Sequence, residues 1–253
     1  MPPFPREVMQ PQFKFGQLLS LAPAASGRPD ETHAALIVSQ ESYQGAVYFE
    51  GSVCTLEQLR VGVANPWETA WLVWNYGDND HFYYFAMKPN GWELGKRDPD
   101  YAGGQRFLAT STDVTFEVGR WNQFSITQVG DRIVISVDGV ELVRFQDLER
   151  PYLGGRIGLY TEDARVMLDD VRGSLNDNFD LASTAALHDG ARLGDLWDVV
   201  FLGYGTGAVV AGISPDLVAV TQVADLVTPP PSALLAFPVT YDPGDWSDGW
   251  ILA

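Results

Sequence analysis

Apolar and polar side chains alternate in short blocks along most of the chain, and glycine, proline, asparagine or aspartate separates the blocks. Alternation with a period of two residues is typical of β-strands that bury one face. Helical periodicity over about ten residues is absent before residue 180. We therefore predict an all-β protein. The predicted strands are residues 33–39, 45–49, 56–63, 69–76, 81–87, 121–129, 132–137, 140–145, 156–161 and 164–171, after a first strand-like block that begins at Phe13.

Short turns connect several of these blocks. Residues 77–80 (GDND) and 88–91 (KPNG) separate three apolar runs, and Asp138-Gly139 is a strong signal for a type I′ hairpin. Such signals recur about every eight to twelve residues, a spacing typical of antiparallel sandwiches and barrels. We predict an antiparallel β-sandwich in which residues 1–253 form one domain.

The two ends of the chain lack this alternation. Prolines at positions 2, 3, 5 and 11 predict an extended arm over residues 1–12, and the triple proline 229–231 predicts an irregular arm over residues 228–253. Two further blocks between the sandwich and the second arm predict strands, at 195–202 and 208–220.

The acidic balance of the chain restricts its partners. The formal net charge is -17, and no cluster of lysine and arginine interrupts it, so nucleic acid is not an expected ligand. The single cysteine, Cys54, excludes an internal disulfide and a cysteine-based zinc site. The longest apolar region, residues 196–227, contains aspartates and a proline, so we expect no membrane span.

Residues 65–98 contain four of the eight tryptophans, together with many charged side chains. Aromatic faces stack on the apolar faces of sugar rings, while neighbouring amides and charges bind the hydroxyl groups. This composition predicts a carbohydrate site here. The candidate binding residues are Trp71, Asn75, Tyr84, Lys88, Trp92 and Lys96.

Strand alternation predicts which of these side chains share a face. Over residues 70–76 it places Leu72, Trp74 and Tyr76 on one face, which we predict to be the core, and Trp71 and Asn75 on the other. Tyr84 and Lys88 are expected to share a face as well.

Candidate catalytic residues are few. Glu93 is the one well-placed glutamate of the aromatic stretch, and His81 is the histidine that we would test as a general base. A retaining glycosidase needs two carboxyl groups about 5 to 5.5 Å apart. Glu162 and Asp163 adjoin the turn of the closing predicted strands, and because neighbouring residues on a strand point to opposite faces, they cannot both act on one substrate.

Several segments resemble the strands of concanavalin A-like jelly rolls. The segments are AWLVWNYGDNDHFYYFAMKPNGWELGK, GRWNQFSITQVGDRIVISVDGVELVRF and GRIGLYTEDA followed by LDDV. This superfamily includes laminin-G-like modules, family 16 glycoside hydrolases, carbohydrate-binding modules and 3-keto-disaccharide hydrolase domains. The likeness covers roughly residues 33–172 and implies an antiparallel jelly roll. The family 16 signature Glu-x-Asp-x-x-Glu is absent from the chain.

The resemblance carries further expectations. It implies a structural Ca²⁺ bound by Asp169 or Asp170, with partners among residues 176–180. It also implies an extracellular or periplasmic location, although the first residues show no apolar segment of a secretory signal peptide. The Asp-Asn-Phe and tryptophan segments that usually open such domains here follow the body. Either residues 176–227 are permuted strands of the same sandwich, or residues 176–253 begin a second, incomplete copy.

The sequence thus leaves three functional hypotheses. The first is a protein that binds or processes a carbohydrate through an aromatic and polar concave groove. The second is a glycoside hydrolase or polysaccharide lyase, and whether the chain is an enzyme stays open. The third is a structural or assembly protein whose terminal arms are exchanged in a homo-oligomer.

Overall fold

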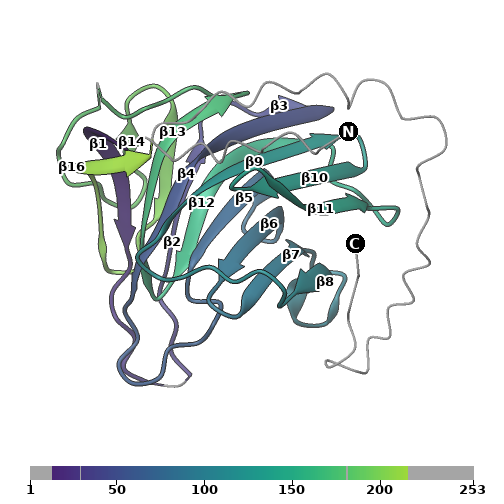
Figure 1. Ribbon diagram of the computed structural model, residues 1–253, viewed down its shortest axis with the longest axis horizontal. Helices are drawn as coiled ribbons and strands as arrows, with labels where there is room; N and C mark the ends of the chain where they lie inside the picture. Colours follow the sequence, from purple (N-terminus) through teal and green to yellow (C-terminus); the bar gives the residue numbers. More distant parts are fainter. Residues whose placement is uncertain (1–12, 29, 181, 216–253) are drawn as a thin grey trace, which may run out of the picture.

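Two antiparallel β-sheets face each other in the computed structural model, which describes residues 13–28, 30–180 and 182–215 (Figure 1). A single-turn 3₁₀ helix at Ala102–Gly104 is the one helical element of the described residues. The predicted all-β class is confirmed. The predicted arms at 1–12 and 228–253 lie outside the described residues.

The seven-stranded sheet has the order β11, β10, β9, β4, β13, β1, β16. Its strands are β1 (Phe13–Ala22), β4 (Ala46–Gln58), β9 (Trp121–Val129), β10 (Arg132–Val137), β11 (Val140–Gln146), β13 (Ala164–Gly173) and β16 (Thr206–Pro215).

The nine-stranded sheet has the order β14, β15, β2, β12, β5, β6, β7, β8, and β3 pairs with β12 beside this path. Its strands are β2 (Ala34–Ser39), β3 (Tyr43–Gln44), β5 (Ala70–Asp78), β6 (His81–Lys88), β7 (Gly91–Arg97), β8 (Gln105–Ser111), β12 (Gly154–Glu162), β14 (Arg192–Leu193) and β15 (Trp197–Phe201).

Strands far apart in the sequence are neighbours in both sheets, as in a jelly roll. β4 lies between β9 and β13, and β5 lies between β12 and β6. Hairpins at β5–β6, β6–β7 and β10–β11 supply the local pairs, at the turns that the sequence predicts. At the last of them, Asp138 and Gly139 both have positive φ, which a type I′ turn requires. The architecture is therefore a jelly-roll β-sandwich.

The core lies between the two sheets. Leu72 and Trp74 of β5 and Tyr83 of β6 pack there against side chains of the seven-stranded sheet such as Phe124. The Trp74 indole donates to the Gln128 amide oxygen at 2.7 Å, so its one polar atom is satisfied inside the core. The predicted inward direction of Leu72 and Trp74 is confirmed.

One strand boundary was predicted wrongly. Residues 45–49 and 56–63 are predicted as two strands, yet Gly51 and Ser52 between them lie inside the single long strand β4. A Cβ atom at Gly51 would lie 3.0 Å from the Phe124 ring and 3.2 Å from the Asp169 carbonyl oxygen. The glycine therefore permits close packing between neighbouring strands and does not reverse the chain.

The later strands extend the two sheets that the earlier strands form. β15 pairs with β2 in the nine-stranded sheet, and β16 pairs with β1 in the seven-stranded sheet. The predicted strand at 195–202 thus contains β15, and the described part of the block 208–220 belongs to β16. Within the described parts of the chain, no helix has the length and hydropathy needed to cross a bilayer.

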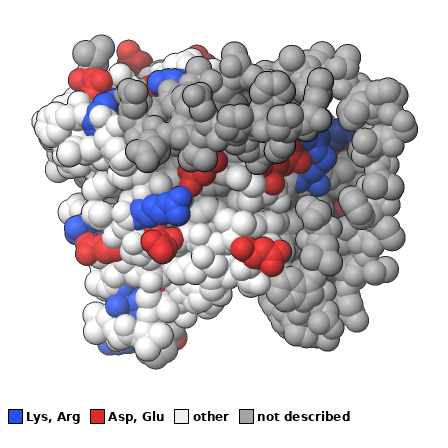
Figure 2. All heavy atoms as spheres, in the orientation of Figure 1, with Lys and Arg blue, Asp and Glu red and all other residues white. Residues whose placement is uncertain are grey.

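Charged side chains are spread over the visible surface. On the described part of the face in Figure 2, Asp and Glu lie near Lys and Arg, and no continuous basic patch is seen. Exposed ion pairs among the described residues include that of Arg144 with Glu141.

Substitution of Trp197 tests whether β15 folds together with the rest of the sandwich. It is buried, its ring stacks on Phe179 at 6.1 Å, and its indole donates to Asp177 at 2.8 Å. We expect Trp197→Ala to lower the free energy of unfolding of the whole protein by about 3–5 kcal/mol, because it leaves a large cavity. The measurement is urea unfolding followed by near-UV circular dichroism.

The matched control is Trp67→Ala, whose side chain is 45% exposed, with an expected change near 0.5 kcal/mol. A separate early transition for the variant, with the main transition unchanged, would show that residues around Trp197 fold independently.

Candidate functional site

The outer face of the nine-stranded sheet carries a second cluster of aromatic side chains. Trp71 on β5 lies opposite Tyr160 on β12 and Ala86 on β6, and Ala86 lies opposite Glu93 on β7. Directly opposed residues point to the same face of a sheet. These side chains therefore form one row, on the face that does not meet the seven-stranded sheet.

Trp71 is the centre of the aromatic cluster. Its ring stacks on Tyr84 with centroids 4.5 Å apart, and it meets Tyr160 at 5.2 Å on the other side. The Trp71 indole donates to the Trp67 carbonyl oxygen at 2.8 Å, which holds the ring in one orientation. The cluster is thus a rigid aromatic layer, with a carboxylate group at each end.

The carboxylate at the β7 end is Glu93. It accepts from the Tyr84 hydroxyl at 2.7 Å and from the Lys88 ammonium at 2.9 Å. The Tyr84 hydroxyl in turn accepts from the Gln105 amide at 2.5 Å. Burial, followed by the nearby Glu93 charge, raises the pKa of Tyr84 well above its ordinary value, so Tyr84 stays a neutral donor. Four polar groups therefore converge beside Trp71.

Gly95 makes room for this arrangement. It lies opposite Tyr84 on the neighbouring strand, and a Cβ atom at this position would overlap the Tyr84 hydroxyl. Any larger residue would push the tyrosine ring off Glu93. The glycine in the sequence GWELGK is thus required by a side chain that crosses over it.

The carboxylate at the β12 end is Glu162, which the sequence analysis did not select as a site residue. It follows Tyr160 by two positions, so both side chains share the outer face, and the Tyr160 hydroxyl donates to Glu162 at 2.6 Å. Burial raises the pKa of Glu162, and the Tyr160 hydrogen bond lowers it in part. Alternation from Tyr160 was the sequence signal that could have identified it.

Four of the predicted site residues come together. Trp71, Tyr84, Lys88 and Glu93 contact one another on the outer face. Their assignment to binding or catalysis remains a prediction, but the structure gives them the shared location that such a role requires.

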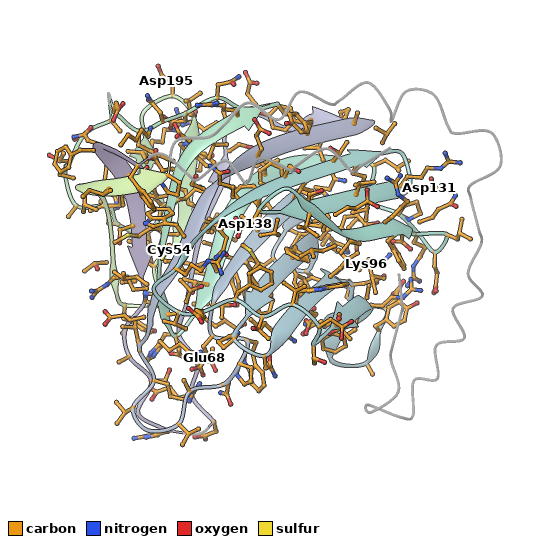
Figure 3. All side chains as sticks on the ribbon, viewed as in Figure 1. Cys54, Glu68, Lys96, Asp131, Asp138 and Asp195 are labelled. Carbon is orange, nitrogen blue, oxygen red and sulfur yellow. The ribbon has the colours of Figure 1, made fainter. Side chains whose placement is uncertain are left out.

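Trp92 and Lys96 point to the opposite face of β7. Trp92 packs on Phe85 in the core, with ring centroids 5.9 Å apart. Lys96 is fully buried (Figure 3). Its ammonium donates to Asp147 at 2.8 Å, to the Glu149 carbonyl at 2.7 Å and to the Arg150 carbonyl at 3.1 Å. All three ammonium protons are used within the protein, so Lys96 anchors the segment between β11 and β12.

A bulge at Asn75 changes the alternation of β5. Asn75 has φ of +48°, the pairing with β6 shifts register here, and its amide donates to the Tyr152 carbonyl at 2.8 Å. The extra residue moves Tyr76 into the outer aromatic cluster. The prediction that Tyr76 shares the inner face with Leu72 and Trp74 is therefore wrong.

His81 lies at the β5–β6 hairpin, away from Glu93. Its Nδ1 atom is 2.7 Å from the Asp78 carboxylate, and this hydrogen bond lowers the pKa of Asp78. Its ring meets Tyr152 edge-on at 6.0 Å, and Tyr152 contacts Tyr83 of the core face. The structure thus does not bring the two predicted catalytic residues together.

Asp169 and Asp170 lie on β13, in the other sheet, and both face Lys14. The Lys14 ammonium is 2.8 Å from Asp170 and 3.5 Å from Asp169, and the Ser214 hydroxyl donates to Asp169 at 2.5 Å. One buried oxygen of Asp170 has no hydrogen-bond partner among the described atoms.

Ca²⁺ takes six to eight oxygen ligands, and the described residues contain no group of three or more acidic, His or Cys side chains placed to bind a metal. Lys14 pairs with both aspartates, so they already have a cationic partner, and the calcium site stays a prediction from resemblance.

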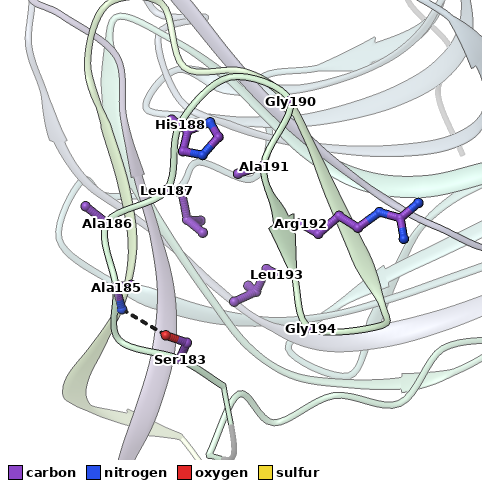
Figure 4. Close-up of a pocket in the computed structure, with 10 residues that line it drawn as sticks. All are labelled: Ser183, Ala185, Ala186, Leu187, His188, Gly190, Ala191, Arg192, Leu193 and Gly194. Atoms are coloured by element: carbon purple, nitrogen blue, oxygen red, sulfur yellow. Dashed lines mark hydrogen bonds between the residues drawn. The ribbon is translucent and has the colours of Figure 1, made fainter.

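A hollow of about 370 Å³ lies in the loop that contains β14 (Figure 4). Its wall is formed mainly by small residues and backbone, with His188 and Arg192 at its rim. None of the predicted site residues lines it. The hollow has neither aromatic rings nor a carboxylate in its wall, so it is a weaker candidate for recognition than the outer face of the nine-stranded sheet.

Comparison with known families gives one match. Residues 31–172, more than half of the 253 residues, match the family model described as a 3-keto-alpha-glucoside-1,2-lyase-like domain. This range runs from the segment before β2 to the end of β13 and contains every residue of the outer-face cluster described above. No curated protein sequence matches the chain.

Solved structures with a similar arrangement have low sequence identity. The carbohydrate-binding module CBM66 from Bacillus subtilis is 15% identical, covers 63% of this chain and 92% of its own, and has a TM-score of 0.46. A double variant of human galectin-16 is 15% identical, with coverages of 55% and 94% and a TM-score of 0.40. A putative glycosyl hydrolase from Parabacteroides distasonis is 11% identical, with coverages of 57% and 84% and a TM-score of 0.38.

Glu162 provides a pH test of the outer face. Because its pKa is raised in the folded protein, protonated Glu162 stabilises the fold. This contribution is fully present below the ordinary value of 4.5 and is lost as the pH rises through the folded value. We expect Glu162→Gln to lose less stability than the wild type between about pH 4 and pH 8. The measurement is the free energy of urea unfolding at each pH.

Glu141→Gln is the control, because Glu141 forms an exposed ion pair with Arg144. Its stability curve should run parallel to that of the wild type. Parallel curves for Glu162→Gln as well would mean that Glu162 titrates as it does in the unfolded chain.

Proposed function

The chain belongs to the family of 3-keto-alpha-glucoside-1,2-lyase-like domains, and we propose that it recognises a carbohydrate through the outer face of its nine-stranded sheet. The observation that carries this proposal is the Trp71–Tyr84–Glu93–Lys88 cluster, in which stacked rings adjoin a paired carboxylate and ammonium. The family and the chemistry of the cluster point to the same class of ligand.

The cluster offers both kinds of contact that a sugar needs. Trp71 is 5% exposed and Tyr84 is fully buried, so the apolar surface open to the C–H groups of a pyranose ring is the exposed part of Trp71, which the stacked Tyr84 ring holds in place. Glu93 accepts hydrogen bonds, whereas Lys88 and Gln105 donate them, so adjacent hydroxyl groups could each find a complementary partner. Because these side chains already hold one another, little side-chain entropy is lost when a ligand binds.

A comparison of two tryptophans tests binding. We expect Trp71→Ala to weaken carbohydrate binding about tenfold or more, which is about 1.4 kcal/mol, because it removes the central stacking surface. The measurement is a glycan array followed by titration of the best glycan.

Trp67→Ala removes an exposed ring outside the stacked cluster and should leave the affinity unchanged. Lys88→Met serves as a second variant in case Trp71→Ala does not fold, and it should also weaken binding. Wild-type protein that binds no glycan, or equal affinities for all variants, would remove the outer face as the site.

The two carboxylates of the outer face favour a second function, an elimination reaction. Glu93 is paired with Lys88, whereas Glu162 has a raised pKa and no salt bridge among the described residues. Two carboxyl groups in unlike environments are the usual source of a base and an acid in one site.

In a 3-keto glucoside, the ketone acidifies the hydrogen on C2. Glu93 would take this proton, the C2–H electrons would form a C1=C2 double bond, and the C1–O bond would break. The proton of Glu162 would pass to the departing oxygen, so that the products are an unsaturated keto sugar and an alcohol.

Release of 4-nitrophenol from its 3-keto-α-glucoside measures this reaction. We expect Glu93→Gln to reduce the rate by about 10²–10⁴-fold, because the amide cannot accept the proton. Glu162→Gln should reduce it more for poor leaving groups than for 4-nitrophenol, since good leaving groups need less protonation. Glu141→Gln on the exposed surface should retain the wild-type rate. A wild type that binds glycans and releases no nitrophenol would leave recognition as the function and exclude elimination of this substrate.

A further inference from the structure

Each sheet ends in two edge strands, and edge strands tend to pair with other chains. The edges are β11 and β16 in the seven-stranded sheet and β14 and β8 in the nine-stranded sheet. An edge strand presents unpaired N–H and C=O groups, and proteins prevent unwanted pairing with charges, bulges, prolines or very short strands.

Three of the four edges carry such a device. β11 contains Glu141 and Arg144 and shifts register against its neighbour. β8 contains Arg106 and also shifts register, and β14 is only two residues long. These edges are protected from a second chain by charge, irregularity or length.

At one end of β16 the Gly207 carbonyl accepts from the Leu187 N–H at 2.7 Å, and between Ala208 and Ser214 the strand has none of these devices. Its sequence TGAVVAGISP contains no charged residue, and its proline is the last residue. All ten residues pair with β1 in one uninterrupted register. The strand is therefore long, regular and uncharged, which is the combination that edge strands usually avoid.

Exposed apolar side chains lie beside this edge. Ile213 on β16 is 58% exposed, and it lies directly opposite Phe15 on β1, which is also exposed, as is Phe13. They continue the inner face of the sheet, where Leu19 and Val209 are buried. The inner face thus extends past the covered core and ends in an apolar surface. We call β16 together with Phe13 and Phe15 the β16 edge.

The charge of the chain restricts where two copies can meet. With a formal net charge of -17, two copies repel each other over most of their surfaces. The β16 edge is a neutral strip where they can approach. Two copies of one strand can pair antiparallel around a two-fold axis, so that the same surface satisfies both edges. Two-fold symmetry is the commonest symmetry of homo-oligomers.

We propose that the β16 edge is a homodimer interface, in which β16 pairs antiparallel with β16 of a second copy and joins the two seven-stranded sheets. Ile213 and Phe15 of both copies cover one another in this arrangement. The proposal does not depend on the carbohydrate site, because it rests on the other sheet.

Molar mass in solution tests the interface. Light scattering after size exclusion should give twice the 27.8 kDa mass of one chain for the wild type. Ile213→Lys should halve this mass, because it brings two buried charges into the interface. Ala211→Lys, at another exposed position of β16, should do the same. Val140→Lys is the matched control, since Val140 is 57% exposed on the charged edge β11, and its mass should stay at two chains.

Hydrogen exchange distinguishes the interface from other causes of association. The β16 amides that point away from β1 should exchange more slowly in the wild type than in Ile213→Lys, while β9 and β10 should be unchanged. A wild type with the mass of one chain at every concentration would overturn the proposal. A dimer that persists in both lysine variants would overturn it as well.

Discussion

The pairing register of β5, β6 and β7 determines the arrangement of both the core and the candidate site. Trp74 and Tyr83 are directly opposed and face the seven-stranded sheet, whereas Trp71 and Tyr84 belong to the opposite face. A slip of one residue between these strands would exchange the two faces and bring Glu93 into the core without a counter-ion. Such a slip is opposed on one side by the packing of the sandwich and on the other by the fit of Tyr84 over Gly95.

Two lysines on adjacent strands illustrate how the faces divide structural and functional roles. Lys96 donates all its protons to Asp147 and to two backbone carbonyls, and its removal would leave the buried Asp147 carboxylate with only the more distant Arg106, at 3.5 Å, as a cationic partner. Lys88 has one carboxylate partner, Glu93, and retains donors that a ligand can use. Composition alone cannot separate the two residues. Strand alternation separates them. Lys88 pairs with Glu93 on the outer face, whereas Lys96 lies three residues after Glu93 on β7 and therefore points to the inner face.

Sequence reasoning reached the sandwich because its strands alternate clearly and its hairpins have strong turn residues. It failed where a local feature is imposed by distant strands. The Asn75 bulge is stabilised by the carbonyl of Tyr152, and Gly51 is required by Phe124 of β9. The residues that cause these two features are therefore distant in the sequence from Asn75 and Gly51. Trp92 and Lys96 were assigned to the site by composition, although alternation from Glu93 would have placed them on the other face. Glu162 lies just beyond the predicted strand 156–161, and the hydrogen bond from the Tyr160 hydroxyl is what ties it to the aromatic cluster.

The two proposals involve different parts of the molecule, and this separation has a functional consequence. β16 is the last strand of the seven-stranded sheet, and Figure 1 shows it on the opposite side of the sandwich from β7 and β8. Pairing of two copies through β16 would therefore leave Trp71 and Glu93 of each copy uncovered by the partner. A dimer of this kind would present two carbohydrate sites to one polymeric ligand, and the second contact would be intramolecular once the first had formed. Weak recognition by each aromatic cluster would then suffice for strong attachment to a polysaccharide, whereas a small glycoside substrate would gain nothing from dimerisation.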